Sequence, residues 1–218
     1  MTYLTHWGVV NSRVTGNGNA ALGGTSNVGI SGVGALNLRT ADATDRAAFG
    51  NEVDFNGRLL SSLTTLFFAV DTTTQNNSTP ANMPGLSLEI NPDVLGSSGP
   101  VSMQYVPDNP AFQGASGFNA TSDDLPRWGL TGPYFNEAGL QDARCGISGN
   151  RCTWPQARAV LGENATINAG LHLFKAGGPF SGSVDLLIVN GAAYDFEPGG
   201  VKNADFTIAQ AAKRFPKR

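Results

Sequence analysis

The amino-acid sequence predicts an all-β protein, an antiparallel β-sandwich or jelly roll with one short helix. Short runs that alternate apolar and polar residues recur along the 218 residues, without the intervening helices that would indicate a parallel sheet. Within residues 183–198, Asn190-Gly191 separates two such runs, and this pair favours the type I′ turn of a β-hairpin. Glycine contributes 28 residues, close to twice its usual share of ~7%, which suits a protein with many turns.

The strands are predicted from period-2 alternation or from a continuous apolar run. Residues 86–91 alternate most clearly, because three large apolar residues are interleaved with three polar ones. Residues 63–70 are apolar enough for a central strand. Residues 203–214 are predicted as a strand or a short helix, with helix favoured after Ile208. The other predicted strands are residues 3–10, 33–40, 47–55, 101–106, 171–175 and the two arms of the hairpin.

One helix is predicted over residues 154–161. Thr153 is a favourable N-cap, and Pro155 falls in the first turn, where its missing N–H costs nothing. Gln156 completes a capping box with Thr153, and Gly162 ends the helix. The helix is short, so we expect it to close one end of the sandwich.

The chain divides into three segments around a single sandwich domain. Residues 1–32 form an N-terminal strand and a glycine-rich arm, residues 33–200 form the sandwich, and residues 201–218 form a basic C-terminal tail. An all-β domain of this size needs no further division.

Charge and hydropathy argue against two classes of partner. Only 14% of the residues are charged and the net charge is −3, with no basic stripe carrying interleaved aromatic residues, so we expect no nucleic-acid partner. No apolar run approaches the ~20 residues that a membrane-spanning helix needs, so we expect no membrane span.

The chain has two cysteines, Cys145 and Cys152, in the segment CGISGNRC. The glycine, serine and asparagine between them allow the loop to close, and no nearby pair of histidines indicates a zinc site. We predict a disulfide, which implies an oxidising compartment and an extracellular location. The alternative is two free thiols in a cytosolic loop.

Six short segments of the sequence follow one another in a recognisable order: residues 34–40, 55–68, 84–91, 153–154, 164–191 and 194–198. Taken together, they resemble a group of uncharacterised bacterial secreted proteins that end in a YDFEP-type hairpin. The resemblance implies a jelly-roll or lectin-like domain in the extracellular space, and it implies no catalytic residue.

The long segment 107–150 is the leading candidate for a ligand site, because loops of this length often carry function. It contains the acidic pair Asp123 and Asp124 and the aromatic residues Trp128 and Tyr134. Exposed aromatic rings stack on sugars, and nearby carboxylates bind sugar hydroxyls. The alternative is that both rings pack in the core, as large aromatic side chains usually do.

Two pairs of carboxylates are candidates for a structural calcium ion, and no other cofactor is expected. Asp195 and Glu197 share one face of the second hairpin strand, and oxygen ligands of this kind suit Ca²⁺. Asp42 and Asp45 form a weaker candidate. The alternative for Asp195 and Glu197 is the polar outer face of a half-buried strand.

Glu52 and Asp54 resemble the alternating carboxylates of jelly-roll glucanases, and a strand would place them on one face with Asn56. The further glutamate of that motif is absent, because Asn56 and Gly57 stand where it would lie. An ordinary strand is therefore the favoured interpretation. The two histidines, at positions 6 and 172, indicate no catalytic triad, because the sequence lacks a nucleophile elbow.

These observations favour a non-catalytic extracellular β-sandwich that binds a polysaccharide or a cell-surface glycan. The first alternative is a structural subunit of an extracellular fibre or matrix, which would self-associate by strand exchange through the glycine-rich arm at residues 11–32. The second alternative is a glycan-active jelly-roll enzyme.

Overall fold

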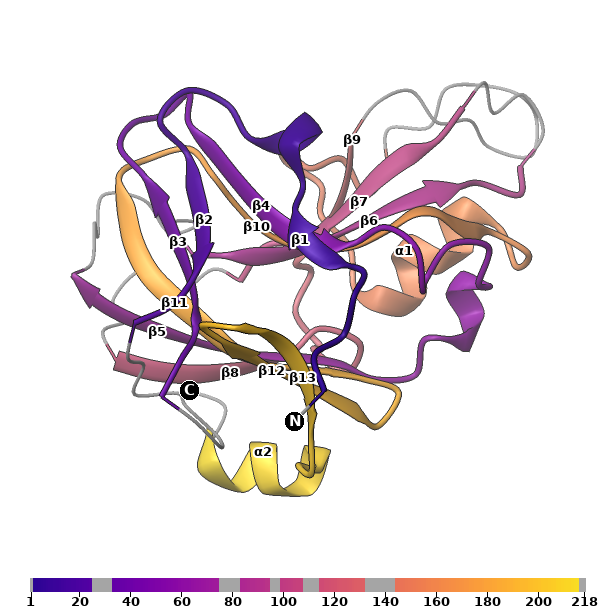
Figure 1. The fold of residues 1–218 in the computed structure, drawn as a ribbon. Helices are drawn as coiled ribbons and strands as arrows, with labels where there is room; N and C mark the ends of the chain where they lie inside the picture. The colour runs from indigo at the N-terminus through magenta and orange to yellow at the C-terminus, as the bar shows by residue number, and fades with distance from the viewer. Residues whose placement is uncertain are drawn as a thin grey trace.

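The structure is a computed structural model, and it describes residues 2–24, 33–74, 83–94, 99–107, 114–131 and 144–215. A six-stranded sheet and a seven-stranded sheet, both antiparallel, pack against each other around one main hydrophobic core (Figure 1). This architecture confirms the predicted all-β sandwich.

The alternation of the sequence decides which side of the six-stranded sheet faces the core. On one of its central strands, Leu86, Leu88 and Ile90 are fully buried in the core, whereas Ser87 and Glu89 lie on the opposite, outer face. Burying each large aliphatic side chain contributes roughly 1.5–3 kcal/mol. In spatial order the strands are β1 (Trp7–Val9), β4 (Arg46–Asn51), β10 (Thr166–Ala176), β6 (Gly85–Asn91), β7 (Val101–Tyr105) and β9 (Trp128–Thr131).

Strand β11 is central to the seven-stranded sheet, because it pairs with β3, β5 and β12. One edge of β11 pairs with β5, which pairs in turn with β8, and the other edge pairs with β12 along one half and with β3 along the other. β13 continues the sheet beyond β12, and β2 continues it beyond β3. The strands are β2 (Asn19–Leu22), β3 (Leu36–Thr40), β5 (Leu66–Thr74), β8 (Gly114–Asn119), β11 (Phe180–Val189), β12 (Ala192–Glu197) and β13 (Gly200–Ala204).

The predicted hairpin is confirmed as β11 and β12. Asn190 and Gly191 have φ angles of 50° and 87°, as a turn with two left-handed central residues requires. The Asn190 side chain also accepts a hydrogen bond from the Thr64 N–H (2.8 Å) and donates one to the Ser62 carbonyl (2.8 Å). The turn residue thereby ties the hairpin to the segment that leads into β5.

The described residues contain two α-helices, whereas the sequence predicts one and leaves the end of the chain as a strand or a helix. The predicted helix is present as α1 (Trp154–Leu161), with the capping box of Thr153 and Gln156. The second helix, α2 (Ile208–Arg214), begins after Thr207 and has a capping box of its own. Of the two alternatives predicted for residues 203–214, the helix is therefore present from Ile208 onward. The described part of the chain also contains two short 3-10 helices, η1 (Asn11–Arg13) and η2 (Leu60–Ser62).

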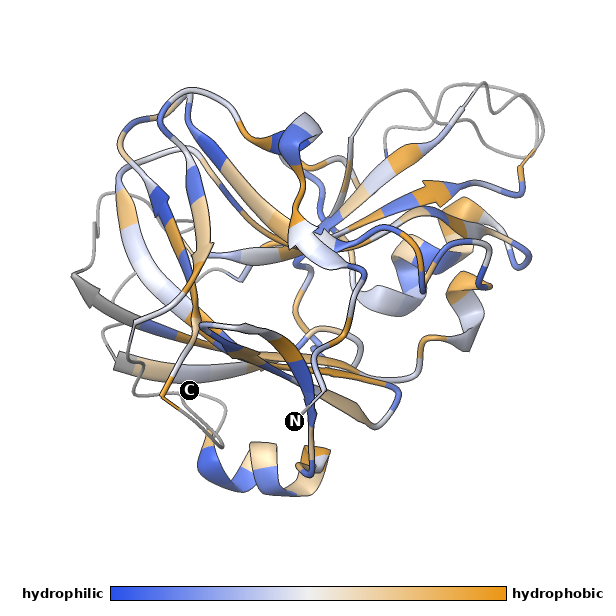
Figure 2. Cartoon of the chain, in the orientation of Figure 1, coloured by the Kyte–Doolittle hydropathy of each residue, from blue (hydrophilic) through white to orange (hydrophobic). Residues whose placement is uncertain are grey.

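Helix α2 covers the outer face of the seven-stranded sheet. Ala211 and Phe215 pack there against Phe67 and Ile188, in a second apolar cluster separate from the main core. Hydrophobic residues accordingly recur along the strands in Figure 2, because this sheet buries apolar side chains on both faces.

Strand β4 is shorter than the strand predicted at residues 47–55. It ends at Asn51, whose side-chain oxygen accepts hydrogen bonds from the backbone N–H groups of Val53 (3.0 Å) and Asp54 (2.8 Å). The side chain thus competes with the sheet for these donors and turns the chain. Residues 52–57 consequently form bends and turns rather than a strand.

The first 24 residues supply an edge strand to each sheet. β1 pairs with β4 at the edge of the six-stranded sheet, and β2 pairs with β3 in the seven-stranded sheet. Helix η1 lies between them in sequence, so the chain crosses from one sheet to the other at this point. Near the other end of the chain, β13 likewise pairs within the sandwich.

The predicted disulfide between Cys145 and Cys152 is confirmed. Its loop follows the edge strand β9. The backbones of Trp128 and Cys152 exchange two hydrogen bonds (2.9 and 2.8 Å), and the Leu130 N–H donates to the Cys145 carbonyl (2.6 Å). The disulfide therefore holds a loop against the edge of the six-stranded sheet.

Candidate functional site

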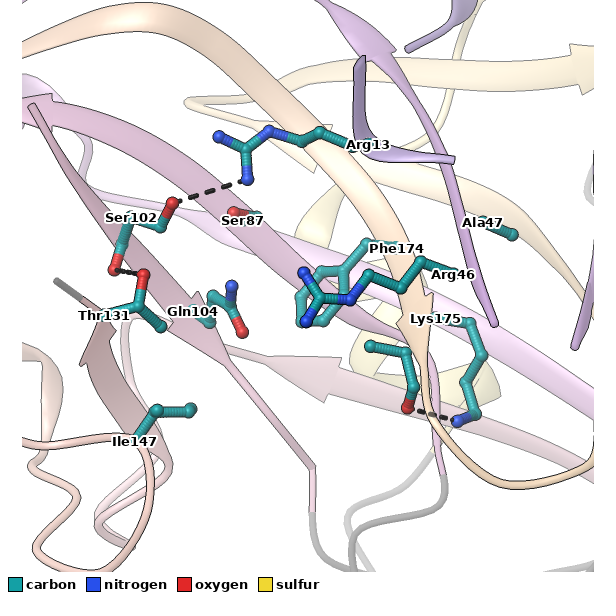
Figure 3. A pocket seen from close by; sticks show the side chains of 11 residues that line it. Arg13, Arg46, Ala47, Ser87, Ser102, Gln104, Thr131, Ile147, Phe174 and Lys175 are labelled. Carbon is teal, nitrogen blue, oxygen red and sulfur yellow. Dashed lines mark hydrogen bonds between the residues drawn. The ribbon is translucent and has the colours of Figure 1, made fainter. Parts of the chain in front are cut away.

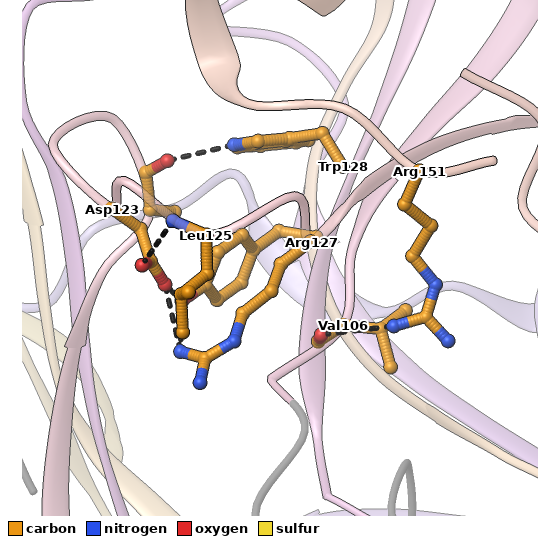
Figure 4. Close-up of polar contacts among 8 residues, drawn as sticks. Val106, Asp123, Leu125, Arg127, Trp128 and Arg151 are labelled. Atoms are coloured by element: carbon orange, nitrogen blue, oxygen red, sulfur yellow. Dashed lines mark hydrogen bonds and ion pairs between the residues drawn. The ribbon is translucent and has the colours of Figure 1, made fainter. Parts of the chain in front are cut away.

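Trp128, which was expected to offer an exposed ring to a sugar, lies in the core. It has no exposed surface, and its indole packs against Trp154 and Tyr105, with ring centroids 4.9 and 5.4 Å away. Its Nε1 donates a hydrogen bond of 2.7 Å to the Ala120 carbonyl (Figure 4). No face of this ring is open to a ligand, which corrects the expectation in favour of the core alternative.

Of the other residues predicted in this loop, the described pair Asp123 and Asp124 does not form a binding site with Trp128. Asp123 forms an ion pair with Arg127 (2.7 Å) and accepts a hydrogen bond of 2.5 Å from the hydroxyl of Tyr105 (Figure 4). Burial raises the pKa of Tyr105, and Asp123 raises it further. This carboxylate therefore fixes the loop to the sheet. Asp124 is exposed, and Tyr134 lies outside the described residues.

Asp195 and Glu197 are buried, whereas the sequence suggested an outward-facing pair. Lys202 on the neighbouring strand places its ammonium 3.1 Å from Asp195 and 2.8 Å from Glu197. The second carboxylate oxygen of Glu197 accepts a hydrogen bond of 3.0 Å from the Gly34 N–H. The positive charge beside these two carboxylates is therefore the Lys202 ammonium, and not the calcium ion that was expected there. Among the described residues, no group of three or more histidine, cysteine or acidic side chains is arranged to hold a metal.

The weaker calcium candidate, Asp42 and Asp45, organises its own loop. Asp45 is buried, and its carboxylate accepts hydrogen bonds from the backbone N–H groups of Asn17 (2.7 Å), Ala41 (2.7 Å) and Asp42 (3.2 Å). A carboxylate that accepts three backbone hydrogen bonds holds the surrounding loop in one conformation.

Glu52 and Asp54 lie in the turn after β4, so the spacing of a strand does not apply to them. Asp54 is 2.6 Å from the Nδ1 atom of His6, and it accepts a hydrogen bond from Asn51 (2.7 Å) that lowers its pKa. Glu52 instead approaches His172, with 3.7 Å between the carboxylate and the Nε2 atom. The two carboxylates thus have different partners.

A pocket of about 350 Å³ opens on the outer face of the six-stranded sheet (Figure 3). The strands β4, β6, β7, β9 and β10 contribute to its lining, together with η1 and the disulfide loop. Its volume falls in the range of small-ligand sites, ~300–1,000 Å³. Its polar lining includes Arg13, Arg46, Ser87, Ser102, Gln104 and Thr131.

Sheet register brings these polar side chains together. Ser87 on β6 pairs with Gln104 on β7 and with His172 on β10, and Ser102 on β7 pairs with Thr131 on β9. Directly paired residues project from the same face, with Cβ atoms ~4.5–5.5 Å apart. The outer face of the sheet therefore carries a patch of polar side chains, whereas its inner face carries leucine and methionine.

Two segments outside the sheet complete the walls. Arg13 from η1 reaches over the face, where its guanidinium lies 2.6 Å from Glu89 and donates to the Ser102 hydroxyl at 3.4 Å (Figure 3). On the opposite side, Ile147 of the disulfide loop lies so close to Gly129 that any side chain there would collide with it. The half-buried ring of Phe174 adds an apolar surface to the lining.

Two buried polar side chains beside each other lack hydrogen-bond partners in the described part of the chain. They are the hydroxyl of Ser87, which lines the pocket, and the imidazole of His172. The pKa of His172 is lowered to about 4, first by burial and then by the charge of Arg13, and the backbone of Ala169 partly opposes both effects through a weak polar contact. The ring is therefore neutral at physiological pH.

Sequence reasoning missed this pocket. The alternation of β6 did predict that Ser87 and Glu89 face away from the core, and the same pattern in β7 applies to Ser102 and Gln104. The sequence contained no signal that η1 near the N-terminus and the disulfide loop would both line a pocket on this face. Pairing between distant strands is what gathers the site.

Comparisons with models of protein families, with characterised proteins and with solved structures give no match for this chain. Within the described ranges, no helix is both long and apolar enough to cross a membrane.

Proposed function

We propose that the protein is a non-catalytic, extracellular β-sandwich that binds a polysaccharide through the pocket on the outer face of its six-stranded sheet. The observation that carries the proposal is the lining of this pocket, where hydroxyl, amide and guanidinium groups surround the half-buried ring of Phe174.

The chemistry of this lining suits a sugar. A sugar ring presents many hydroxyls, each of which can donate and accept hydrogen bonds, and the side chains of Ser87, Gln104 and Thr131 can do both. A sugar also has an apolar C–H face that packs against aromatic rings, and Phe174 offers such a surface. The buried Ser87 hydroxyl would gain from a ligand hydroxyl the partner that it lacks among the described residues.

The pocket favours binding over glycoside hydrolysis. A glycosidase needs two carboxyl groups on either side of the scissile bond, one of them as the general acid. None of the lining residues that the structure describes is acidic. The nearby Glu89 is paired with Arg13 at 2.6 Å.

The extracellular location in this proposal is supported by the disulfide, because such bonds persist in oxidising compartments. The described part of the arm at residues 11–32 contains β2, which already pairs with β3 of the same chain. Self-association through this arm is therefore not favoured.

The proposal is tested by removing one polar and one apolar group from the pocket. We expect the wild-type protein to bind at least one member of a polysaccharide panel in calorimetry, and both Gln104→Ala and Phe174→Leu to weaken that binding at least tenfold. Asn203→Ala is the matched control for the amide, because Asn203 is exposed on β13 of the other sheet. Equal affinity in all four proteins would move binding elsewhere, and no binding to any glycan would reject the proposal.

A further inference from the structure

The pocket wall is cationic although the chain as a whole is anionic. Its described lining includes Arg13, Arg46 and Lys175 and no acidic residue, while the net charge of the chain is −3. Positive side chains gathered in a concave site attract anionic ligands.

The three cations differ in how far the protein already satisfies them. Arg13 is neutralised by Glu89 at 2.6 Å. Lys175 is buried, and its ammonium donates a hydrogen bond to its neighbour's carbonyl, Ala176, at 2.7 Å. Arg46 is exposed at the start of β4, and no carboxylate of the described residues forms an ion pair with it. Among the cations of the described lining, Arg46 is therefore the one that is free to recognise a ligand.

Arg46 on β4 and Ser87 on β6 line the same pocket (Figure 3). Phe174 also lines it, and its strand β10 lies between β4 and β6 in the sheet. The guanidinium is planar and can hold both oxygens of a carboxylate at once. The Ser87 hydroxyl is buried and lacks a partner among the described residues, so it offers a hydrogen bond to a ligand hydroxyl. A ligand that satisfies both groups and covers the aromatic ring carries a carboxylate and hydroxyls on one ring.

We propose that the pocket selects an acidic sugar, a hexuronate unit of an anionic polysaccharide, with its carboxylate on Arg46, a hydroxyl on Ser87 and a ring face on Phe174. This inference rests on the proposed polysaccharide binding and adds the class of sugar to it. A neutral sugar would leave Arg46 without an anionic partner.

The test compares a tetrasaccharide of galacturonic acid with the same oligomer after reduction of its carboxyl groups, by calorimetry at fixed salt. We expect wild-type protein to bind the acidic oligomer at least tenfold more tightly than the neutral one. Arg46→Gln removes this preference, and Arg46→Lys keeps only part of it because lysine does not make the paired contact. Arg39→Gln is the matched control, since Arg39 is an exposed strand arginine of the other sheet.

The outcomes separate this inference from the proposed function. Equal binding of both oligomers that still depends on Gln104 would overturn the acidic preference and leave polysaccharide binding intact. A sulfated oligomer that binds as tightly as the galacturonate would overturn the assignment of a carboxylate. Binding of neither these oligomers nor any other glycan would overturn both proposals.

Discussion

At the scale of single residues, the cost of buried polar groups points to the pocket. Ser87 and His172 are paired across β6 and β10, and their polar atoms lack hydrogen bonds to the described residues. Each buried polar group without a partner costs about 1–3 kcal/mol. Of the two, Ser87 lines the pocket, so a ligand hydroxyl there can offset the cost of its buried hydroxyl.

His172 should make the protein less stable in mild acid. Its pKa is lowered to about 4 by burial and by Arg13, although Glu52 lies 3.7 Å from the ring. The unfolded chain takes up this proton below about pH 6.5, whereas the folded protein resists it until about pH 4. Stability is therefore lost as the pH falls through this window, by at most about 3 kcal/mol.

Urea unfolding at pH 7 and pH 4 measures this loss. We expect His172→Gln to reduce the difference in unfolding free energy between the two pH values, whatever its effect at pH 7. Asn203→Ala, which changes an exposed side chain that does not titrate, should leave the difference close to that of the wild type. An unchanged pH dependence in His172→Gln would show that other groups govern acid stability.

Lys202 should be essential to the folded state, because it compensates two buried carboxylates. Lys202→Met leaves Asp195 and Glu197 without their ammonium, and removing one partner of a buried ion pair costs about 3 kcal/mol. Denaturation at neutral pH measures the cost. Lys213→Met, which removes an exposed lysine of α2, is the control and should stay within about 0.5 kcal/mol of the wild type. Adding Glu197→Gln to Lys202→Met should recover part of the loss, and no recovery would argue against charge compensation.

At the scale of secondary-structure elements, the sequence predicts best what local signals determine. Helix α1 and the hairpin turn depend on neighbouring residues, and both have their predicted form. β4 ends early because the side chain of Asn51 captures two backbone donors, an effect that alternation does not report. β8, with the sequence GASGFN, lacks the alternating large residues that mark a strand, and its pairing with β5 defines it.

The candidate site was less predictable than the fold for the same reason. The polar positions of β6 and β7 could be assigned to the outer face from their period, but their neighbours on β10 depend on register between distant segments. For Trp128 the sequence left two alternatives open, since aromatic residues in a long loop serve either a core or a ligand, and the structure decides for the core. The role of Lys202 was overlooked because it lies on β13, whereas its carboxylate partners lie on β12, and only the pairing of the two strands brings them together.

The disulfide loop should contribute both to stability and to the shape of the pocket. Closing a loop of this length stabilises a protein by roughly 2–3 kcal/mol on the chain-entropy model. We expect Cys145→Ser/Cys152→Ser to lose about this much in denaturation, and to bind glycan more weakly because Ile147 no longer holds its place against Gly129. The chain has no other cysteine, so reduction of the wild type provides an independent control. Unchanged affinity after reduction would separate the loop from the binding site.

At the scale of the whole molecule, the N-terminal segment joins the two sheets and contributes to the site. Between its edge strands β1 and β2 it carries Arg13, which bridges Glu89 and Ser102 on the outer face. The same 24 residues thus close one edge of each sheet and form part of the pocket wall. Exchange of these strands with a second copy would first have to break both sets of pairings.

We therefore expect the protein to be a monomer in solution. β1 and β2 find their partners within the chain, so an exchanged dimer gains no strand hydrogen bonds that the monomer lacks. Light scattering during size exclusion, at concentrations from micromolar to near millimolar, should give the mass of one chain throughout. The control is protein refolded from urea at high concentration, the condition that most favours strand exchange. A polymer in freshly purified protein that is lost on deletion of residues 11–24 would instead support the fibre alternative, because only strand exchange makes assembly depend on that arm.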